Sequence, residues 1–361
     1  MSATPAPWAA DTPTLLQNTL EHIARAWVTV SGGSDIELNV LDGTVSFDEG
    51  RTPRCSVELT CAIPAREQLT NIDPRLTGRR LVVQTGYRRP DGTEDVQTLA
   101  DVQLRGRALN WPDNTMRLTA LGDEAKLMDA APAAPFTLTE SGASNAIAAL
   151  LESAGIGYIL QGSATVDLTA FSIDPVNDLW DAIEDVCDQI GADFYATAVR
   201  SQEYQLDYRP TLAATAAYTV ATGAAGTITG AAYSIDRDEW HNAVFLEHVW
   251  RDAADADHRV AARKDATGTY APSSGNRRIL HVVRSNPTTA AKAATAAQTL
   301  ANRQTTKGRS MGVTAISAYW LRPGDTIAGA LPDRDTERHL LASVTFRLAD
   351  GLMDLSTRLP E

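Results

Sequence analysis

Residues 285–358, the last quarter of the chain, limit the possible folds more than any other stretch. They combine one helix pattern with strands that are joined by tight turns. An alanine-rich stretch at 288–302 predicts the helix. The sequence RPGD at 322–325 predicts a type II turn, since proline sets φ at about −65° and glycine accepts a positive φ. Asp350-Gly351 between two alternating stretches predicts a hairpin. We therefore expect a closed β unit with a helix lying on it.

Composition and charge exclude several function classes for this 361-residue chain, which is long enough for two or three domains. Its formal net charge of −13 argues against a nucleic-acid-binding surface, which needs a basic patch, and against attraction to an anionic membrane. No stretch approaches the roughly 18 apolar residues of a membrane span, and the first residues show no signal-peptide pattern. We expect a soluble protein.

The three cysteines predict no disulfide framework. Cys55 and Cys61 lie an even number of positions apart in an alternating stretch, which places both thiols on one strand face, roughly 20 Å apart. That separation is too long for a disulfide between them. Cys187 lies on the apolar side of a predicted helix. All three are expected to be small core residues of a protein made in a reducing compartment.

The spacing of the apolar residues changes along the chain and divides it into four segments. Strand-type alternation gives way to a helical period after an Ala-Pro linker, and alternation resumes after an Ala/Thr/Gly stretch. No sequence repeat between the two β regions is visible. The segments are an N-terminal arm and helix at 1–30, a first β domain at 31–130, an α/β insertion domain at 131–212, and a second β domain at 213–361 with a polar loop at 251–276 and a helix at 288–302.

Local signals place elements within these segments. The N-terminal amphipathic helix is expected to end near Arg25, and Asp42-Gly43 predicts a turn. The first β region has six or seven short strands with regular turns, which is typical of a sandwich or barrel. In the insertion, Asp174-Pro175 predicts the start of a helix that Gly191 ends. The polar segment 251–276 is interpreted as a long loop or hairpin.

No catalytic, cofactor-binding or metal-binding residues are predicted. The six histidines are scattered and lack the helical spacing of a zinc-binding motif, and no nucleophile elbow or phosphate-binding loop is present. Solvated loops or helix faces explain three acidic groups better than metal ligands or carboxylate pairs do, and the first of them lacks the mid-loop glycine and terminal glutamate of a calcium loop. These groups are Asp252, Asp255 and Asp257 with His258; Asp333, Asp335 and Glu337; and Glu184, Asp185 and Asp188.

Four tryptophans offer a choice between two uses. Trp180, Trp240, Trp250 and Trp320 could line a sugar-binding surface, because aromatic rings stack on sugar faces. They lie inside periodic segments, which favours packing in the core.

Five segments follow one another in an order that is more specific than any of them alone. They are 38–48 followed by Arg54, the helix and hairpin at 174–194, the strand start at 242–244, the alanine-rich helix with 321–327, and the final strand pair ending at Arg358. Together they resemble the tail hub proteins of long-tailed phages, especially minor tail proteins of siphophages with high-GC hosts. The resemblance covers most of the chain from about residue 20 onward, and the charged segment 251–276 departs from it.

The resemblance implies a β-rich α+β fold in which two tail-tube-like β-barrel or sandwich domains flank the small α/β insertion. It further implies a homotrimer whose six such domains form a pseudo-sixfold ring, joining a hexameric tail tube to a threefold tip. The implied partners are distal tail and tail tube proteins, the tape measure protein, and tip or spike proteins, with DNA only in transit through the lumen. No cofactor or enzyme activity is implied. The implied location is the virion tail tip, after assembly in the host cytoplasm.

Two other functions stay open at this point. A receptor- or cell-wall-carbohydrate-binding tip protein would use exposed tryptophans as stacking platforms, with Trp250 and Trp320 as the residues to test. A tail-borne peptidoglycan-degrading enzyme would need a catalytic set, and no residue constellation recommends one.

Overall fold

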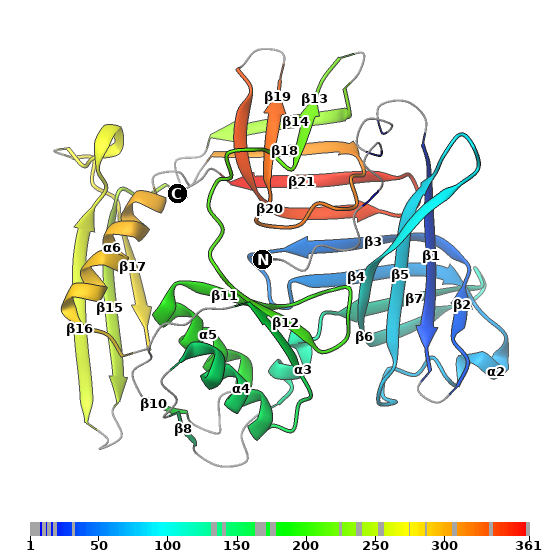
Figure 1. The fold of residues 1–361 in the computed structure, drawn as a ribbon, viewed down its shortest axis with the longest axis horizontal. Helices are drawn as coiled ribbons and strands as arrows, with labels where there is room; N and C mark the ends of the chain where they lie inside the picture. Colours follow the sequence, from blue (N-terminus) through cyan, green and yellow to red (C-terminus); the bar gives the residue numbers. More distant parts are fainter. Residues whose placement is uncertain are drawn as a thin grey trace.

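The computed structural model places two groups of strands in one large sheet, beside an α/β unit and a smaller α+β module (Figure 1). No described helix is long and apolar enough to span a membrane. The structure describes Trp8, Thr12, Leu16 and the ranges 20–30, 33–130, 136–138, 142–162, 171–173, 178–223, 226–235, 240–251, 256–273, 275–285, 287–304, 309–331 and 335–358.

The large sheet has 13 strands and runs β14-β18-β21-β20-β3-β4-β7-β6-β5-β1-β2, with β19 and then β13 branching from β20. The first strand group is β1 (Glu21–Thr29), β2 (Ile36–Leu38), β3 (Val40–Asp48), β4 (Cys55–Ala62), β5 (Arg80–Arg88), β6 (Glu94–Asn110) and β7 (Thr115–Leu121). The second strand group is β13 (Tyr218–Ala221), β14 (Ile228–Ile235), β18 (Arg309–Ile316), β19 (Thr326–Ala330), β20 (Glu337–Arg347) and β21 (Leu352–Arg358). Two short helices, α2 (Arg66–Leu69) and α3 (Glu124–Met128), belong to the first half.

The two strand groups meet at the antiparallel pair β3–β20, where Phe47 lies opposite Val344 and Val45 opposite Phe346. All four side chains are buried in one core cluster that both groups share. The rings of Phe47 and Phe346 pack edge to face at 6.2 Å between centroids. The two β regions that the sequence separates therefore share one sheet and one core.

The two strand groups repeat one order of pairing, although the sequence shows no repeat. In the first group the order is β1-β5-β6-β7-β4-β3, and in the second it is β13-β19-β20-β21-β18-β14. Neighbouring strands are antiparallel throughout, except that β13 is parallel to β19 whereas β1 is antiparallel to β5. The first group also has the extra strand β2.

The registers agree residue by residue between β3-β4-β7-β6 of the first group and β14-β18-β21-β20 of the second. A bulge interrupts β6 between Leu104 and Gly106, and the equivalent bulge interrupts β20 between Leu341 and Ser343. The last strand of each group also has a bulge: β3 between Val40 and Asp42, where it pairs with β4, and β14 between Ile228 and Gly230, where it pairs with β18. Following the pairing across each sheet gives the equivalent rows Asp42-Thr60-Arg117-Ala108 and Gly230-Thr314-Asp354-Thr345.

The α/β unit packs below the sheet with a core of its own. Its helix α5 begins at Leu179, where the Asp178 side chain accepts a hydrogen bond from the N–H of Asp181, and ends at Gly191, which has φ of 67°. The predicted start at Asp174-Pro175 lies outside the described residues. The unit contains β8 (Phe136–Leu138), α4 (Ala143–Ser153), β9 (Ile159–Gly162), β10 (Phe171–Ile173), α5 (Leu179–Ile190), β11 (Ala192–Ala196) and β12 (Glu203–Tyr208).

A separate module, which the sequence did not predict, interrupts the second strand group between β14 and β18. It consists of β15 (Ala243–Arg251), β16 (Asp257–Asp265), η1 (Gly268–Tyr270), β17 (Ile279–Arg284) and α6 (Ala290–Gln304). The strands form their own sheet in the order β16-β15-β17. Ala297 and Ala301 of α6 pack on Val244 and Leu246 of β15, because alanine lets the helix approach the sheet closely. We refer to 240–304 as the inserted module.

Two local predictions are wrong, and one alternative is decided. The N-terminal helix was expected to reach Arg25, but 21–29 forms β1, because pairing with β5 over nine residues outweighs the local helical spacing. Asp42-Gly43 does not turn and lies within β3 beside its bulge. The polar loop 251–276 contains β16, so the hairpin alternative holds for 257–265. The Ala/Thr/Gly stretch before the second β region contains β13. The helix predicted at 288–302 is confirmed as α6.

Candidate functional site

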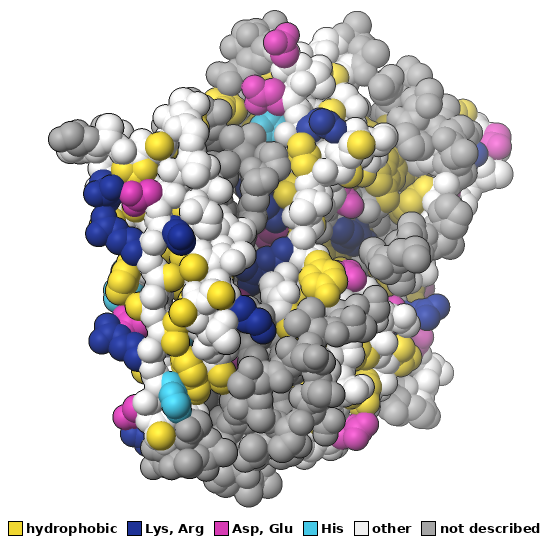
Figure 2. Space-filling view, turned by 60° about the vertical axis from the view of Figure 1, so that its left-hand side comes forward, with side chains coloured by type: hydrophobic (Ala, Val, Ile, Leu, Met, Phe, Trp, Pro, Cys, Tyr) yellow, Lys and Arg dark blue, Asp and Glu magenta, His cyan; other side chains and the backbone are white. Residues whose placement is uncertain are grey.

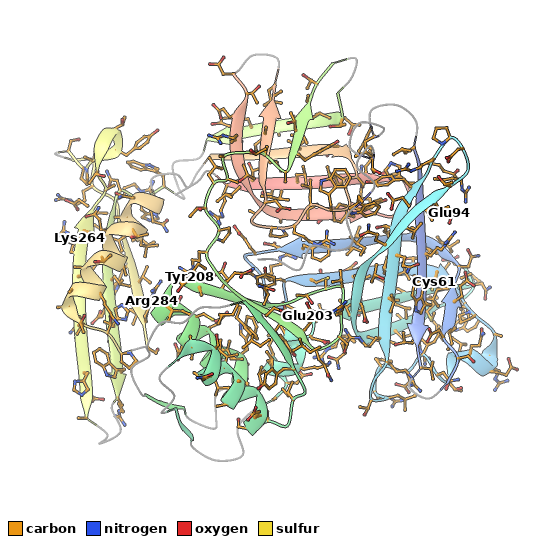
Figure 3. All side chains as sticks on the ribbon, in the orientation of Figure 1. Cys61, Glu94, Glu203, Tyr208, Lys264 and Arg284 are labelled. Atoms are coloured by element: carbon orange, nitrogen blue, oxygen red, sulfur yellow. The ribbon has the colours of Figure 1, made fainter. Side chains whose placement is uncertain are left out.

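A cleft of about 390 Å³ lies where the large sheet meets the α/β unit. Its walls come from the start of β4, the β11–β12 hairpin and the turn at 322–325. A second cleft of about 250 Å³ adjoins it along α5. In Figure 3, Tyr208 and Glu203 mark the two ends of strand β12 in the α/β unit beside the sheet.

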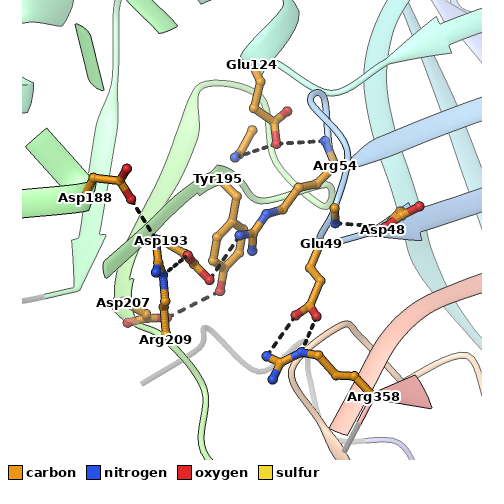
Figure 4. Close-up of polar contacts among 12 residues, drawn as sticks. Asp48, Glu49, Arg54, Glu124, Asp188, Asp193, Tyr195, Asp207, Arg209 and Arg358 are labelled. Atoms are coloured by element: carbon orange, nitrogen blue, oxygen red, sulfur yellow. Dashed lines mark hydrogen bonds and ion pairs between the residues drawn. The ribbon is translucent and has the colours of Figure 1, made fainter. Parts of the chain in front are cut away.

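Paired charges line both clefts (Figure 4). Arg54, the residue before β4, pairs with Asp193 of β11 at 3.2 Å. Its guanidinium lies over the ring of Tyr195, 4.6 Å from the ring centroid. Arg209 pairs with Asp193 at 3.3 Å and with Asp188 of α5 at 2.8 Å. The Arg54–Asp193 pair joins the large sheet to the α/β unit, whereas the two pairs of Arg209 hold Asp193 and Asp188 within that unit.

Two further contacts tie distant parts of the chain to the same place. Glu49, in the turn after β3, pairs with Arg358 at the end of β21. Arg284 of β17 approaches Asp188 of α5 at 3.6 Å, which links the inserted module to the α/β unit. Figure 3 shows Arg284 on the edge of the inserted module that faces the α/β unit.

The turn at 322–325 holds a half-buried arginine. Arg322 donates to the carbonyls of Tyr319 and Leu321 at 2.8 and 2.7 Å, and its guanidinium lies over the ring of Phe47. Burial lowers the pKa of Arg322 to about 10, so the group remains charged at neutral pH. Asp325 accepts a hydrogen bond from the Arg322 N–H at 2.7 Å and closes the turn. The predicted type II turn is present, with φ of 90° at Gly324.

The buried carboxyl of Glu124 joins the same two parts of the molecule. Its Oε1 accepts hydrogen bonds from the N–H of Ala196 at 3.0 Å and from the N–H of Arg54 at 3.4 Å. Burial raises its pKa to about 7. The cysteine thiols are also buried, which raises the pKa of Cys61 to about 11 and those of Cys55 and Cys187 further, so they are protonated core thiols at neutral pH.

The acidic groups weighed in the sequence do not gather into a metal site within the described residues. Asp257 pairs with Arg251 at the end of the β15–β16 hairpin, and Asp252, Asp255 and Asp333 lie outside the described ranges. Asp188 belongs to the ion-pair network described above. Burial raises the pKa of Asp185 to about 6, and repulsion from neighbouring carboxylates adds to the effect.

All four tryptophans take part in ring packing. Trp180 is buried in the α/β core and packs on Phe194. Trp320 is half-buried between Trp8 and Tyr218. Trp240 packs on Tyr270, and Trp250 stacks on His258 at 5.2 Å.

The sequence analysis did not identify this junction as a site, although it singled out the segments that contain its residues. Arg54, Asp193 and the 322–325 turn all belong to the segments whose order carries the phage-tail resemblance. They lie far apart in the sequence, and the fold brings them to one cleft. Their pairing depends on the placement of the α/β unit, which no local pattern encodes.

Neither a family model nor a curated protein sequence matches the chain. Solved structures do match. A tail protein from Neisseria meningitidis MC58 has a TM-score of 0.66 at 14% identity, over 93% of this chain and 96% of its own. The 43 kDa tail protein of prophage MuSo2 from Shewanella oneidensis also has a TM-score of 0.66 at 14% identity, over 94% and 99%. A prophage tail protein from Listeria monocytogenes EGD-e has a TM-score of 0.54 at 10% identity, over 92% and 94%. The chain therefore shares, over nearly its whole length, the fold of phage tail proteins.

Proposed function

We propose that this chain is a structural subunit of a phage tail, the hub at which a hexameric tail tube joins a threefold tip. The observation that carries the proposal is the repeated strand order of the two groups, within a fold shared with phage tail proteins. A subunit with two equivalent strand groups can fill two of the six positions in a ring. Three copies would then form a pseudo-sixfold ring on one side and keep threefold symmetry on the other.

The paired charges at the junction support a structural role. Each charge has an opposite charge within contact distance, and the Arg54–Asp193 pair holds the α/β unit on the sheet. A net charge of −13 would repel DNA phosphates, which suits a lumen that DNA crosses without binding. The partners in this proposal are two further copies, the tail tube and distal tail proteins, the tape measure protein and the tip or spike proteins. The proposal assigns the chain no enzyme activity.

The proposal predicts where the subunit lies and how many copies a tail contains. A tagged chain, incorporated into tails and imaged with an electron-dense label, should mark the tip end only. Quantitative mass spectrometry of purified tails should give three copies per particle. Label along the tube, or a stoichiometry of one or six, would contradict the hub assignment.

A further inference from the structure

Each end of the eight-strand run β14-β18-β21-β20-β3-β4-β7-β6 presents a strand edge without a strand partner among the described residues. At one end, β14 pairs only with β18. At the other end, β5 pairs with β6 only as far as Gln103, while β7 continues to Asn110 on the opposite side. The N–H of Leu104 still donates to the carbonyl of Arg79 at 3.1 Å, so residues 105–110 of β6 have one edge without a strand partner among the described residues. Backbone N–H and C=O groups alternate along such an edge and can accept another strand.

Neither edge contains a proline, and neither presents a charged side chain without a partner within the protomer. The sequence of β14, ITGAAYSI, contains no charge and no proline, and Thr229 and Ala231 are exposed. On β6, the charged side chains are engaged within the protomer. Arg105 pairs with Asp129, and Arg107 donates to the carbonyls of Leu69 and Ile72. By contrast, the edge strand β16 of the inserted module carries a series of charged side chains, and Figure 2 shows Lys and Arg gathered along that side.

The joint between the two strand groups provides a template for a contact between these edges. Within one chain, residues 343–347 of β20 pair with 44–48 of β3. In the repeat, β6 is the equivalent of β20 and β14 is the equivalent of β3. We propose that β14 of one copy pairs antiparallel with residues 106–110 of β6 in the next copy, in the register of the β20–β3 joint. This inference rests on the proposed ring of copies and names the strands that close it.

The equivalent rows fix the register of this contact. Aligned through the bulges, Arg347 corresponds to Asn110 and Thr44 corresponds to Ala232. Because Arg347 lies opposite Thr44 within the chain, Asn110 of one copy should lie opposite Ala232 of the next. The contact joins two different surfaces, so it repeats from copy to copy and closes into a ring when the rotation allows.

The test is a cysteine pair in the full-length chain. Asn110 and Ala232 are both exposed, so Asn110→Cys and Ala232→Cys should leave the protomer fold intact. Directly opposed strand residues have Cβ atoms about 5 Å apart, close enough for a disulfide after a small adjustment. The native cysteines are buried, so a crosslink after mild oxidation would report the introduced pair. We expect covalent dimers and trimers on a denaturing gel and no larger species, with monomers only from each single variant.

A matched control moves one cysteine along β14. Thr229 is also exposed but lies three residues from Ala232, about 10 Å along the strand, so Asn110→Cys with Thr229→Cys should not crosslink. Equal crosslinking in the two pairs, or none in the first, would overturn the proposed register. Native mass measurement separates the two proposals. A trimer that does not crosslink rejects the β14–β6 contact and keeps the trimer, whereas a crosslinked ladder beyond three keeps the contact and rejects the trimeric hub.

Discussion

Glu124 makes the junction between the sheet and the α/β unit sensitive to pH. The side chain is fully buried, and Oε2 has no hydrogen-bond partner among the described residues, while Oε1 holds two backbone N–H groups. Because burial raises its pKa from 4.5 to about 7, the folded state favours the protonated carboxyl. The stability that this preference supplies is fully present below about pH 4.5 and is lost as the pH rises through about 7.

Glu124→Gln should remove this pH dependence. The amide keeps the shape of the protonated carboxyl and its carbonyl can accept the same hydrogen bonds, but it cannot ionise. We expect the variant to gain up to about 3 kcal/mol over the wild type between pH 5 and pH 8, measured by urea unfolding at both values. Glu124→Ala, which removes the acceptor, should lose about 1–3 kcal/mol at either pH. A wild type and a Gln variant with parallel pH profiles would contradict the assigned ionisation.

At the scale of single elements, the β20–β21 hairpin is fixed by more than its turn. Gly351 has φ of 66°, and a Cβ there would lie 2.4 Å from Cγ of His22. The His22 ring packs against Tyr87 and Tyr319, so it has little room to move. The hairpin tip of the second strand group therefore packs directly on β1 of the first group.

Gly191 and Gly351 have the same left-handed backbone conformation but different surroundings. Comparing them separates the cost of backbone strain from the cost of a steric clash. Gly191 has φ of 67°, but a Cβ there would meet nothing within 4 Å. Gly191→Ala should cost about 1 kcal/mol, the strain of a left-handed residue with a side chain. Gly351→Ala should cost clearly more, because the His22 cluster must also shift. Thermal unfolding of both variants measures the difference, and equal losses would mean that the His22 contact adds nothing.

Elements that depend on local chemistry could be predicted from the sequence, and those that depend on distant pairing could not. The 322–325 turn, the Asp350-Gly351 hairpin and α6 each follow from neighbouring residues, and each is present. The β1 strand was missed because its apolar residues fit a helical spacing until β5 pairs with it. The ion pairs at the cleft depend on the docking of whole units, so no local pattern could reveal them.

At the scale of the whole molecule, the repeat of the two strand groups is a property of pairing rather than of sequence. Equivalent rows contain unlike residues, such as Arg117 and Asp354, because exposed strand positions tolerate almost any side chain. What both groups keep is the order of strands and the bulges that bend them. A comparison of residue types along the sequence could not find this repeat. The inserted module also separates β14 from β18, so the strands of the second group are spaced differently along the chain from those of the first.

The inserted module should be separable from the rest of the chain. Its core is distinct from that of the large sheet, and in the first group the connection equivalent to β14–β18 is the short turn at 49–54. We expect that replacing 236–308 with a six-residue turn leaves a chain that unfolds cooperatively, with a melting temperature within about 5 °C of the wild type. Circular dichroism during heating measures this. A shortened chain without a cooperative transition would show that the module stabilises the main core.

The position of the inserted module has a consequence for how such an assembly could be oriented. Only one of the two strand groups carries the inserted module. In a ring of six strand groups, the inserted module would therefore project at every second position. In the proposed ring, the three projections would break the sixfold repeat that the two strand groups keep. A neighbouring component with threefold symmetry could then find its rotational setting by contacting the rim alone.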